Sequence, residues 1–472
     1  MYNLIIPAGN LFMKFMFTRE PLRRDISITR PKNYMGIARG TVIGAFEQLH
    51  AEGVLETKPA SGTCVARSLA DSSHSRSVRE SAFSDLNSIP PARATTFAKV
   101  YDEFSPLPQV PFAVSVPQGL ALPEDAWRKL GNRIRARGPG APSGYDDPQG
   151  TSALREAVAE YVRRSRSVRC EPEQVIITSG IQQALYLCCQ LFLEKGDQVW
   201  VEDPAYRGLT AILESAGDES SMVRVPVDAE GIQVETGIRL APDARVAFVT
   251  PSHQYPLGMP MSMSRRNALV RWANDHHSWI VEDDYDSELR YAGHPFPSLQ
   301  GLAPSRVIYL GTFSKILFPS LRLGYAIVPK GLETAFCGAR ILMDRHPPSA
   351  DQHVLAAFIR EGHLDRHIRR IRGIYAERRD QLVEMIQRHI PATRGWLQPG
   401  DQGMHMVLWL SEDIDDRKTA TAALAAGVAV RPVSSTFSIA RKRPGLILGL
   451  GDFSLADMES AVHVLARIIT SV

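Results

Sequence analysis

The chain has 472 residues, of which 44% are hydrophobic and 22% charged, with 34 glycines and 32 prolines. These proportions are typical of a folded globular protein and exclude a wholly disordered or fibrous chain. No apolar run is long enough to span a membrane, and the first residues lack a basic leader and a cleavage site. Together with five unpatterned cysteines, these features predict a cytoplasmic protein without a membrane partner.

The net charge of +3 is unevenly distributed along the chain. Residues 1–67 hold nine lysines and arginines against five acidic residues, an excess of four positive charges that leaves −1 for the rest. A small basic head on a nearly neutral body is typical of a nucleic-acid-binding appendage, although a chance local excess would give the same count.

The first predicted helix lies between residues 41 and 53, where apolar residues recur at helical spacing and Gly53 ends the helix. The turn-rich segment 58–65 then predicts a β-hairpin. This order is that of a winged helix-turn-helix, in which a recognition helix enters the major groove and the wing contacts the DNA backbone. The alternative is a helix and hairpin without a ligand. The DNA-binding candidates are Arg39 and Thr41 in the helix and Lys58, Ser61 and Gly62 in the wing.

Residues 68–97 are rich in serine, contain Pro90-Pro91 and show no periodicity, which predicts a flexible linker. Beyond it, short β-branched runs alternate with helical patterns such as Ser152–Arg166. This alternation predicts an α/β fold with a mostly parallel sheet covered by helices on both faces. The predicted strands are 174–178, 198–201, 245–250, 279–281, 307–310 and 324–328. A smaller α+β domain should close the chain, with strands at 404–410 and 446–449 and helices at 417–426 and 455–469.

The sequence Gly311-Thr-Phe-Ser-Lys315 directly follows a predicted buried strand. A lysine in such a dry environment more readily holds the neutral amine that forms a Schiff base with an aldehyde. Arg322, together with the hydroxyls of Thr312 and Ser314, supplies donors for a phosphate dianion. The motif therefore predicts a site for an aldehyde and a phosphate; a surface lysine and arginine are the alternative.

Carboxylates gather at the end of the predicted strand 279–281, in Glu282-Asp-Asp-Tyr-Asp-Ser-Glu288. Ligands bind at this edge of open α/β sheets. Asp283 and Tyr285 should point to one face, where the carboxylate can pair with a protonated pyridinium nitrogen and the phenol can reach a ring hydroxyl. Asp284 should point away from that face. A solvated acidic loop is the alternative interpretation.

Three further strand ends complete the pattern. The Ser179-Gly180 turn before a helix offers free amides and the positive end of the helix dipole to the same phosphate. Tyr206, in Val201-Glu-Asp-Pro-Ala-Tyr206, is placed to stack on a ring, and Tyr255 precedes a Pro-x-Gly turn.

Together, these motifs resemble the fold-type-I pyridoxal-phosphate enzymes of the aspartate aminotransferase superfamily. More narrowly, the chain is similar to the MocR-type regulators, which join a GntR-like winged-helix head to an aminotransferase-like body. In the body, the motifs that carry this likeness are the acidic motif Glu282–Glu288, the lysine motif Gly311–Lys315, Gly144-Tyr-Asp-Asp-Pro-Gln-Gly150, Thr178-Ser-Gly-Ile-Gln-Gln183 and Thr250-Pro-Ser-His-Gln254. In the head, they are Ile37-Ala-Arg-Gly-Thr-Val42, Phe46-Glu-Gln-Leu-His-Ala-Glu-Gly53 and Ser61-Gly-Thr-Cys-Val65. Residues 1–38 do not match the first half of such a head.

The resemblance implies pyridoxal 5′-phosphate as cofactor and Lys315 as the catalytic residue that binds it covalently. Asp283 would pair with the ring nitrogen, Tyr285 and Tyr255 would lie near the ring oxygen, and Tyr206 would stack on the ring. Tyr145 would reach the phosphate from the neighbouring subunit of a homodimer. The residues around the phosphate would be Ser179, Gly180, Ile181, Thr312, Ser314 and Arg322. No metal site is expected.

The resemblance also implies a domain order: a head at 1–67, with 1–38 atypical, a linker at 68–97 and a body at 98–472. Within the body, a large domain spans about 140–345 and a small domain about 98–139 and 346–472. The predicted function is transcription regulation: the head binds operator DNA, and the body senses pyridoxal phosphate or an amino compound.

The alternative function is a pyridoxal-phosphate-dependent aminotransferase with a vestigial head. Aminotransferases hold the substrate α-carboxylate with an arginine on a late strand of the small domain. The corresponding strand here, 446–449, has none. Arg207 and Arg431 are the remaining candidates for binding a substrate or effector carboxylate, and transamination should be weak or absent.

Overall fold

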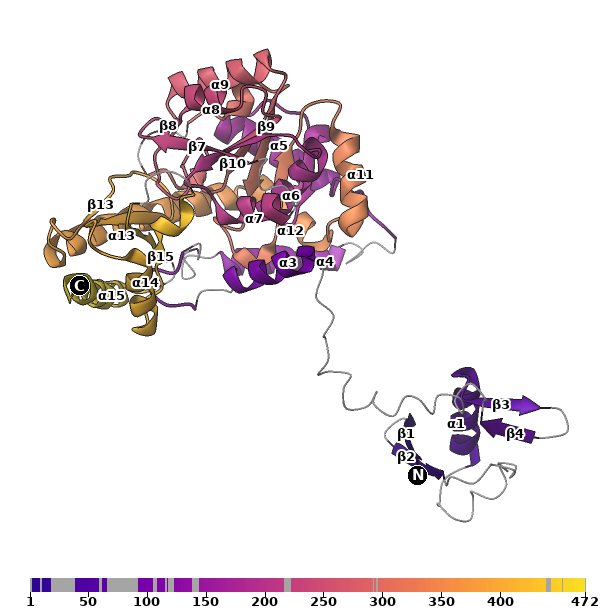
Figure 1. The fold of residues 1–472 in the computed structure, drawn as a ribbon. Coiled ribbons are helices and arrows are strands. Elements are labelled where there is room, and N and C mark those ends of the chain that lie inside the picture. The colour runs from indigo at the N-terminus through magenta and orange to yellow at the C-terminus, as the bar shows by residue number, and fades with distance from the viewer. Residues whose placement is uncertain are drawn as a thin grey trace. The chain divides into compact units, whose positions relative to one another are not determined.

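The computed structural model describes residues 2–8, 11–17, 39–58, 62–65, 92–104, 108–114, 117, 123–137, 144–215, 222–291, 293, 296–438, 443–451 and 453–471. The chain divides into two compact units, a head unit over Met1–Pro91 and a body unit over Ala92–Val472 (Figure 1). None of the described helices is both long and apolar enough to cross a membrane.

The head unit contains the predicted helix and hairpin. Helix α1 (Arg39–Ala51) is followed by the antiparallel strands β3 (Leu55–Lys58) and β4 (Gly62–Val65). Gly53, with a φ of +70°, ends the helix because glycine adopts this left-handed conformation without strain. Leu49 on α1 and Leu55 on β3 are buried. A second antiparallel hairpin, β1 (Tyr2–Ala8) and β2 (Leu11–Phe17), lies in the segment that showed no helical pattern.

The DNA-binding candidates are spread over these elements. Arg39 opens α1 and Thr41 lies in its first turn, while Lys58 ends β3 and Gly62 begins β4. Ser61 lies outside the described residues.

Within the described part of the body unit, an eight-stranded sheet forms the centre. Five strands, namely β11, β10, β9, β6 and β7, run parallel to one another. Strands β12 and β8 run antiparallel to their neighbours. All six predicted strands are confirmed, and β7 and β8 are additional. The spatial order is β5 (Val175–Thr178), β12 (Gly324–Ile327), β11 (Val307–Thr312), β10 (Trp279–Asp284), β9 (Val246–Val249), β6 (Val199–Asp203), β7 (Met222–Asp228) and β8 (Gly231–Ile232).

Helices cover both faces of this sheet, as predicted. Successive residues of a strand point to opposite faces, so Ile176 packs with the helices of one face and Ile177 with those of the other. Trp200 stacks on Trp272 of α9, with ring centroids 3.8 Å apart. One layer contains α6 (Ile181–Phe192), α7 (Arg207–Ser215) and α11 (Glu333–Asp344); the opposite layer contains α5 (Ser152–Arg166), α8 (Val234–Leu240), α9 (Met263–Asp275) and α12 (Ala350–Arg360).

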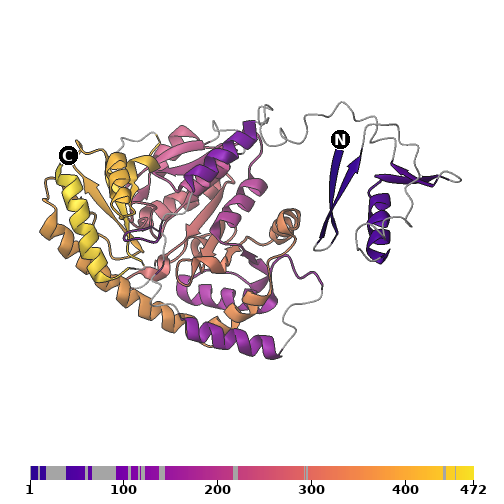
Figure 2. The ribbon, with the colours of Figure 1, turned by 90° about the horizontal axis from the view of Figure 1, so that it is seen from below.

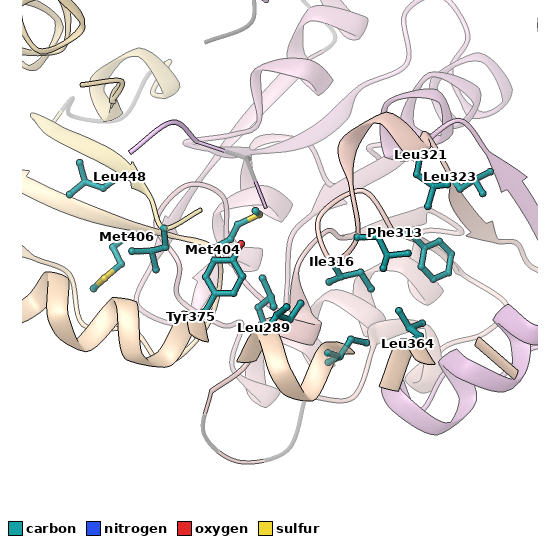
Figure 3. Packing of buried hydrophobic residues seen from close by; sticks show 14 of the residues in the cluster. Leu289, Phe313, Ile316, Leu321, Leu323, Leu364, Tyr375, Met404, Met406 and Leu448 are labelled. Atoms are coloured by element: carbon teal, nitrogen blue, oxygen red, sulfur yellow. The ribbon is translucent and has the colours of Figure 1, made fainter. Parts of the chain in front are cut away.

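The chain closes with an α+β region that contains every predicted late element. Helix α13 (His363–His389) leads into an antiparallel sheet in the order β13 (Gly395–Leu397), β14 (His405–Leu410), β16 (Gly445–Gly449) and β15 (Arg431–Pro432). Two further helices, α14 (Asp416–Ala425) and α15 (Leu455–Ser471), pack together, and α15 lies alongside α13 (Figure 2). Figure 3 shows part of the shared core, where Tyr375 of α13 lies near Met404 and Leu289.

Two helices precede the central sheet. Helix α3 (Ala92–Glu103) begins directly after Pro90-Pro91, so the linker predicted over 68–97 was too long at its C-terminal end. Helix α3 packs against α7, and α4 (Glu124–Arg137) packs against α12, which in turn packs against α5. These helices therefore contact the large-domain layers, whereas the predicted domain boundaries place α4 and α12 in the small domain.

The remaining elements are short. They are η4 (Pro172–Gln174), η6 (Ser287–Leu289), α10 (Leu299–Leu302), η7 (Pro319–Leu321) and η8 (Val433–Thr436).

Candidate functional site

A cavity of about 180 Å³ lies at the carboxyl ends of the parallel strands. Ten of the twelve residues predicted to bind the cofactor line it, and Ser179 and Tyr145 do not. Met404 and His405, at the start of β14, also line it, so the cavity lies where the central sheet meets the smaller one. The predicted residues brought together are Gly180, Ile181, Tyr206, Tyr255, Asp283, Tyr285, Thr312, Ser314, Lys315 and Arg322.

Lys315 lies in the turn that follows β11. The Ser314 backbone N–H donates a hydrogen bond to Thr312 Oγ1 at 3.2 Å, which stabilises this turn. Burial lowers the pKa of Lys315 to about 8, against the opposing effect of Asp286 and Asp283. A substantial fraction of the amine is therefore neutral near that pH and able to act as a nucleophile.

Asp283 lies on β10, and its Oδ1 atom is buried without a hydrogen-bond partner among the described residues. Burial and, to a lesser extent, the charges of Asp284, Glu202 and Asp286 raise its pKa to about 8. Such a carboxyl group gains most from a cationic partner, since an unpaired buried charge is costly. Asp284 points to the other side of the strand, as predicted, and accepts hydrogen bonds from Arg166 and Ser287.

One end of the cavity is suited to an anion. Helix α6 begins at Ile181, and its N-cap, Gly180, has a φ of +90° and no side chain to accept from the helix amides. The Ser314 Oγ atom is buried and has no partner among the described residues. Arg322 borders the same end, and its Nη2 donates to the Ser179 carbonyl at 2.5 Å. Free amides, a hydroxyl and a guanidinium are the donors that a phosphate requires.

Two glycines allow this close approach. A Cβ atom at Gly180 would lie 3.3 Å from the Arg322 guanidinium nitrogens, and one at Gly324 would lie 2.8 Å from the Cα of Gly180. Ser179 does not line the cavity, and its backbone N–H donates to Gln183 Oε1 at 2.8 Å.

Three tyrosines line another side of the cavity. The Tyr206 and Tyr255 rings meet edge to face with centroids 5.8 Å apart, and Tyr255 and Tyr285 do so at 6.0 Å. Burial raises the pKa of Tyr206 to about 12 and also raises the pKa of the other two phenols. All three therefore remain protonated at neutral pH and can donate hydrogen bonds.

Sequence reasoning missed four buried polar residues at the site: Glu202, His253, Asp286 and His405. Glu202 accepts hydrogen bonds from Thr250 Oγ1 at 2.6 Å and Gln254 Nε2 at 3.2 Å, and burial raises its pKa to about 7. Glu202, His253 and Asp286 lie inside the strand-end motifs, and this position in the sequence was the signal that could have identified them. His405 comes from a distant strand, and no local pattern indicated it.

The two candidate carboxylate-binding arginines differ in their partners. Arg207 is engaged, because its Nε lies 2.6 Å from Glu103 Oε2 and its Nη1 2.7 Å from Glu214 Oε2. Arg431 lies on β15 opposite Ile447 of β16, and its guanidinium has no hydrogen bond or ion pair with any described residue. Its positive charge contributes to lowering the pKa of Lys315, which lines the cavity, although Arg431 itself is not among the lining residues.

Tyr145 is 79% exposed and lies under Arg345, whose Cζ is 4.7 Å from the ring centroid. It does not line the cavity of its own chain. A contribution to the cavity of a second subunit stays a prediction.

Residues 108–443 match the family model for aminotransferase class I and II. Kynurenine aminotransferase from Pyrococcus horikoshii has a similar structure, with a TM-score of 0.70 and 27% identity over 83% of this chain and 97% of that one. The α-aminoadipate aminotransferase LysN from Thermus thermophilus, solved with a phosphopyridoxyl compound, gives 0.70 and 25% over 80% and 94%. The body unit thus has the fold of the fold-type-I pyridoxal-phosphate-dependent transferases.

Relatives that match nearly the whole chain are regulators. The probable rhizopine catabolism regulatory protein MocR of Rhizobium meliloti is 38% identical over 91% of this chain and 86% of its own. The pyridoxine biosynthesis regulator PdxR of Corynebacterium glutamicum is 32% identical over 96% and 91%. The chain belongs to the MocR-type family of transcription regulators, which confirms the predicted family and favours the regulator over the aminotransferase alternative.

Proposed function

We propose that this protein is a DNA-binding transcription regulator whose body unit binds pyridoxal 5′-phosphate at Lys315 and responds to an amino compound. One observation carries the cofactor assignment: Lys315, with its lowered pKa, shares a cavity with Asp283, whose buried Oδ1 has no partner among the described residues. A pyridinium nitrogen that keeps its proton is the cation that this carboxyl group requires.

The other residues of the cavity fit the same ligand. Bound there, pyridoxal phosphate would supply an aldehyde for an amine and an electron-withdrawing ring. Lys315 would hold the aldehyde carbon, and the tyrosines would hold and cover the ring. The phosphate donors would be the amides that follow Gly180, the Thr312 and Ser314 hydroxyls and the Arg322 guanidinium.

We further propose that the effector carries a carboxylate next to its amino group. Arg431 supports this, because its charge acts on Lys315 and its guanidinium has no acidic partner among the described residues. Arg207 is the weaker candidate, since two glutamates already neutralise it.

The head unit would bind operator DNA through the start of α1 and the β3–β4 hairpin. Similarity to HTH-type transcriptional regulators, such as TauR of Rhodobacter capsulatus and the uncharacterized YhdI of Bacillus subtilis, supports this assignment. A homodimer in which Tyr145 reaches the second cavity completes the proposal.

Absorbance tests the cofactor assignment. Wild-type protein reconstituted with pyridoxal phosphate should show a visible band that survives dialysis. Lys315→Ala should lose the band, whereas Lys330→Ala, an exposed lysine outside the cavity, should keep it. A colourless wild type after reconstitution would contradict the proposal. Binding of the full-length protein to its own upstream DNA, with and without cofactor, tests the regulatory part.

A further inference from the structure

Two buried residues lie behind Tyr285 and are not explained by cofactor contacts. Tyr285 Oη is 3.0 Å from His253 Nδ1, and the same nitrogen lies 3.0 and 2.9 Å from the two carboxylate oxygens of Asp286. His253 is 4% exposed and Asp286 is 1% exposed. Water therefore does not compete for these contacts, and their hydrogens must be distributed among the three side chains.

The position of the imidazole proton follows from the partners of Nδ1. An ionised carboxylate only accepts hydrogen bonds, so Nδ1 carries a hydrogen and donates it to Asp286. A protonated Nδ1 has no free lone pair for the Tyr285 hydroxyl. The hydroxyl hydrogen of Tyr285 must therefore point to another acceptor, and Tyr285 lines the cofactor cavity.

Asp286 has a second effect on the phenol. Burial and, next in size, the charge of Asp286 raise the pKa of Tyr285 well above its usual value. Tyr285 is thus kept as a donor across the physiological range. His405, whose ring centroid lies 5.2 Å from that of His253, adds no competing charge, because burial lowers its pKa to about 4.

We propose that His253 and Asp286 are positioning residues that hold Tyr285 as a hydrogen-bond donor to the ring oxygen of bound pyridoxal phosphate. This inference rests on the proposed function. Without the Nδ1 hydrogen, the Asp286 carboxylate, whose charge acts most strongly on Tyr285, would be free to accept the Tyr285 hydroxyl hydrogen and draw it away from the cavity. The Asp286–His253 pair prevents this diversion.

The ligand atoms of His253, Asp286 and His405 lie within 4.8 Å of one another, a spacing that a metal ion could use. Hydrogen bonds account for the cluster without one. Nδ1 of His253 is engaged by Asp286, and Nε2 of His405 lies 3.0 Å from the Pro256 carbonyl, to which it donates.

The readout is the protonation of the Lys315 nitrogen that carries the cofactor. A donor to the ring oxygen stabilises the negative oxygen most after that nitrogen loses its proton, so the donor lowers the pH midpoint of the visible band. Every other group facing these atoms is unchanged in the variants below. These groups are Asp286, Asp283, Arg322 and Arg431 around Lys315, and Asp286, Tyr255, Asp283 and Glu202 around Tyr285.

The test is a double-mutant cycle on the holoprotein. Tyr285→Phe and His253→Phe should each raise the pH midpoint by about one unit, a tenfold change in proton affinity, and the double variant should show no further shift. His276→Phe is the matched control, because His276 Nδ1 lies 3.0 Å from Asp243 in a similar pair outside the cavity. Its midpoint should equal that of the wild type.

Two results would overturn the inference while leaving the cofactor in place: a wild-type midpoint in His253→Phe, or shifts that add fully in the double variant. If His253→Phe does not fold, His253→Asn replaces it, because the asparagine amide can still donate to Asp286. His253→Asn should keep the wild-type midpoint, and a raised midpoint in this variant would contradict the proposed positioning role of His253. A wild type with no visible band would instead overturn the proposed function, and this inference with it.

Discussion

Arg166 and Asp284 form an ion pair in which both side chains are only 1% exposed, with Arg166 Nε 2.7 Å from Asp284 Oδ2. The pair joins α5 to the end of β10, next to Asp283. Two further acceptors, the Phe296 carbonyl and Ser252 Oγ, lie 2.7 and 2.5 Å from the remaining guanidinium nitrogens. The ion pair and these two hydrogen bonds therefore hold α5 against the end of β10, which carries the candidate site.

Arg166→Met should destabilise the body unit by about 3–5 kcal/mol, because it leaves the Asp284 carboxylate buried without its cation. Arg164→Met on the same helix is the control. Arg164 pairs with Asp365 on the surface, where the side chains are 56% and 40% exposed, and such pairs contribute only about 0–1 kcal/mol. Urea unfolding of both variants measures the difference. Equal losses would show that burial of the Arg166 pair does not determine its contribution.

Asp283→Asn should stabilise the cofactor-free protein at pH 8. The folded-state pKa of Asp283, about 8, is raised above its usual 3.8, so the wild type loses stability as pH rises through this window. Asparagine stays neutral and avoids that loss, which is on the order of a few kcal/mol. Urea unfolding at pH 5 and pH 8 should show a gap that widens with pH. Exposed Asp275→Asn should show no such widening, and a constant gap for Asp283→Asn would contradict the prediction.

Arg431→Gln should weaken the response to amino acids selectively. A carboxylate that loses its charged partner costs roughly 2–5 kcal/mol, more than a tenfold change in affinity. The measurement is titration of the cofactor absorbance with amino acids and with their decarboxylated amines. The wild type should prefer the amino acids, and Arg431→Gln should lose that preference. Arg207→Gln should keep it, since Arg207 is already paired with Glu103 and Glu214.

Transamination of common amino acids should be slow or absent. Strand β16 reads Gly445-Leu-Ile-Leu-Gly449 and offers no arginine to the substrate carboxylate. The contact that aminotransferases make from this strand is therefore missing, at a cost of about 2–5 kcal/mol, and Arg431, which we propose for the effector carboxylate, lies on the neighbouring strand β15. Amino-group transfer to a 2-oxo acid, followed over hours with each amino acid, checks this. Turnover at ordinary enzyme rates, roughly 1–1,000 per second, would favour the aminotransferase alternative.

Lys58→Ala and Arg39→Ala should affect DNA binding differently. Lys58 ends the first strand of the wing, so its loss should weaken binding to all sequences and reduce the salt dependence by about one ion. Arg39 opens α1, where side chains of a recognition helix meet base edges, so its loss should change which operator is preferred. Affinities at several salt concentrations, for the protein's own upstream DNA and for scrambled DNA, separate the two effects.

Local patterns in the sequence were enough to predict the elements of the body unit and the residues with a chemical role at the strand ends. Strands at 307–310 and 279–281 were recognisable because buried strands need continuous apolar runs. Lys315 and Asp283 stood out because a lysine or a carboxylate directly after such a run is costly without a ligand. The two-residue period of a strand was enough to predict that Asp284 points away from the face that carries Asp283.

The polar residues that support this site, and the start of the body unit, could not be predicted from such patterns. His405 reaches the cavity from β14, and Arg166 reaches Asp284 from α5, across separations that no local period encodes. Arg207 is paired with Glu103 of α3, and the start of this helix was predicted as linker. The sequence therefore could not show that Arg207, rather than Arg431, is already paired. Periodicity reports which face of an element is apolar, whereas the partner of a buried charge is fixed by how distant elements pack.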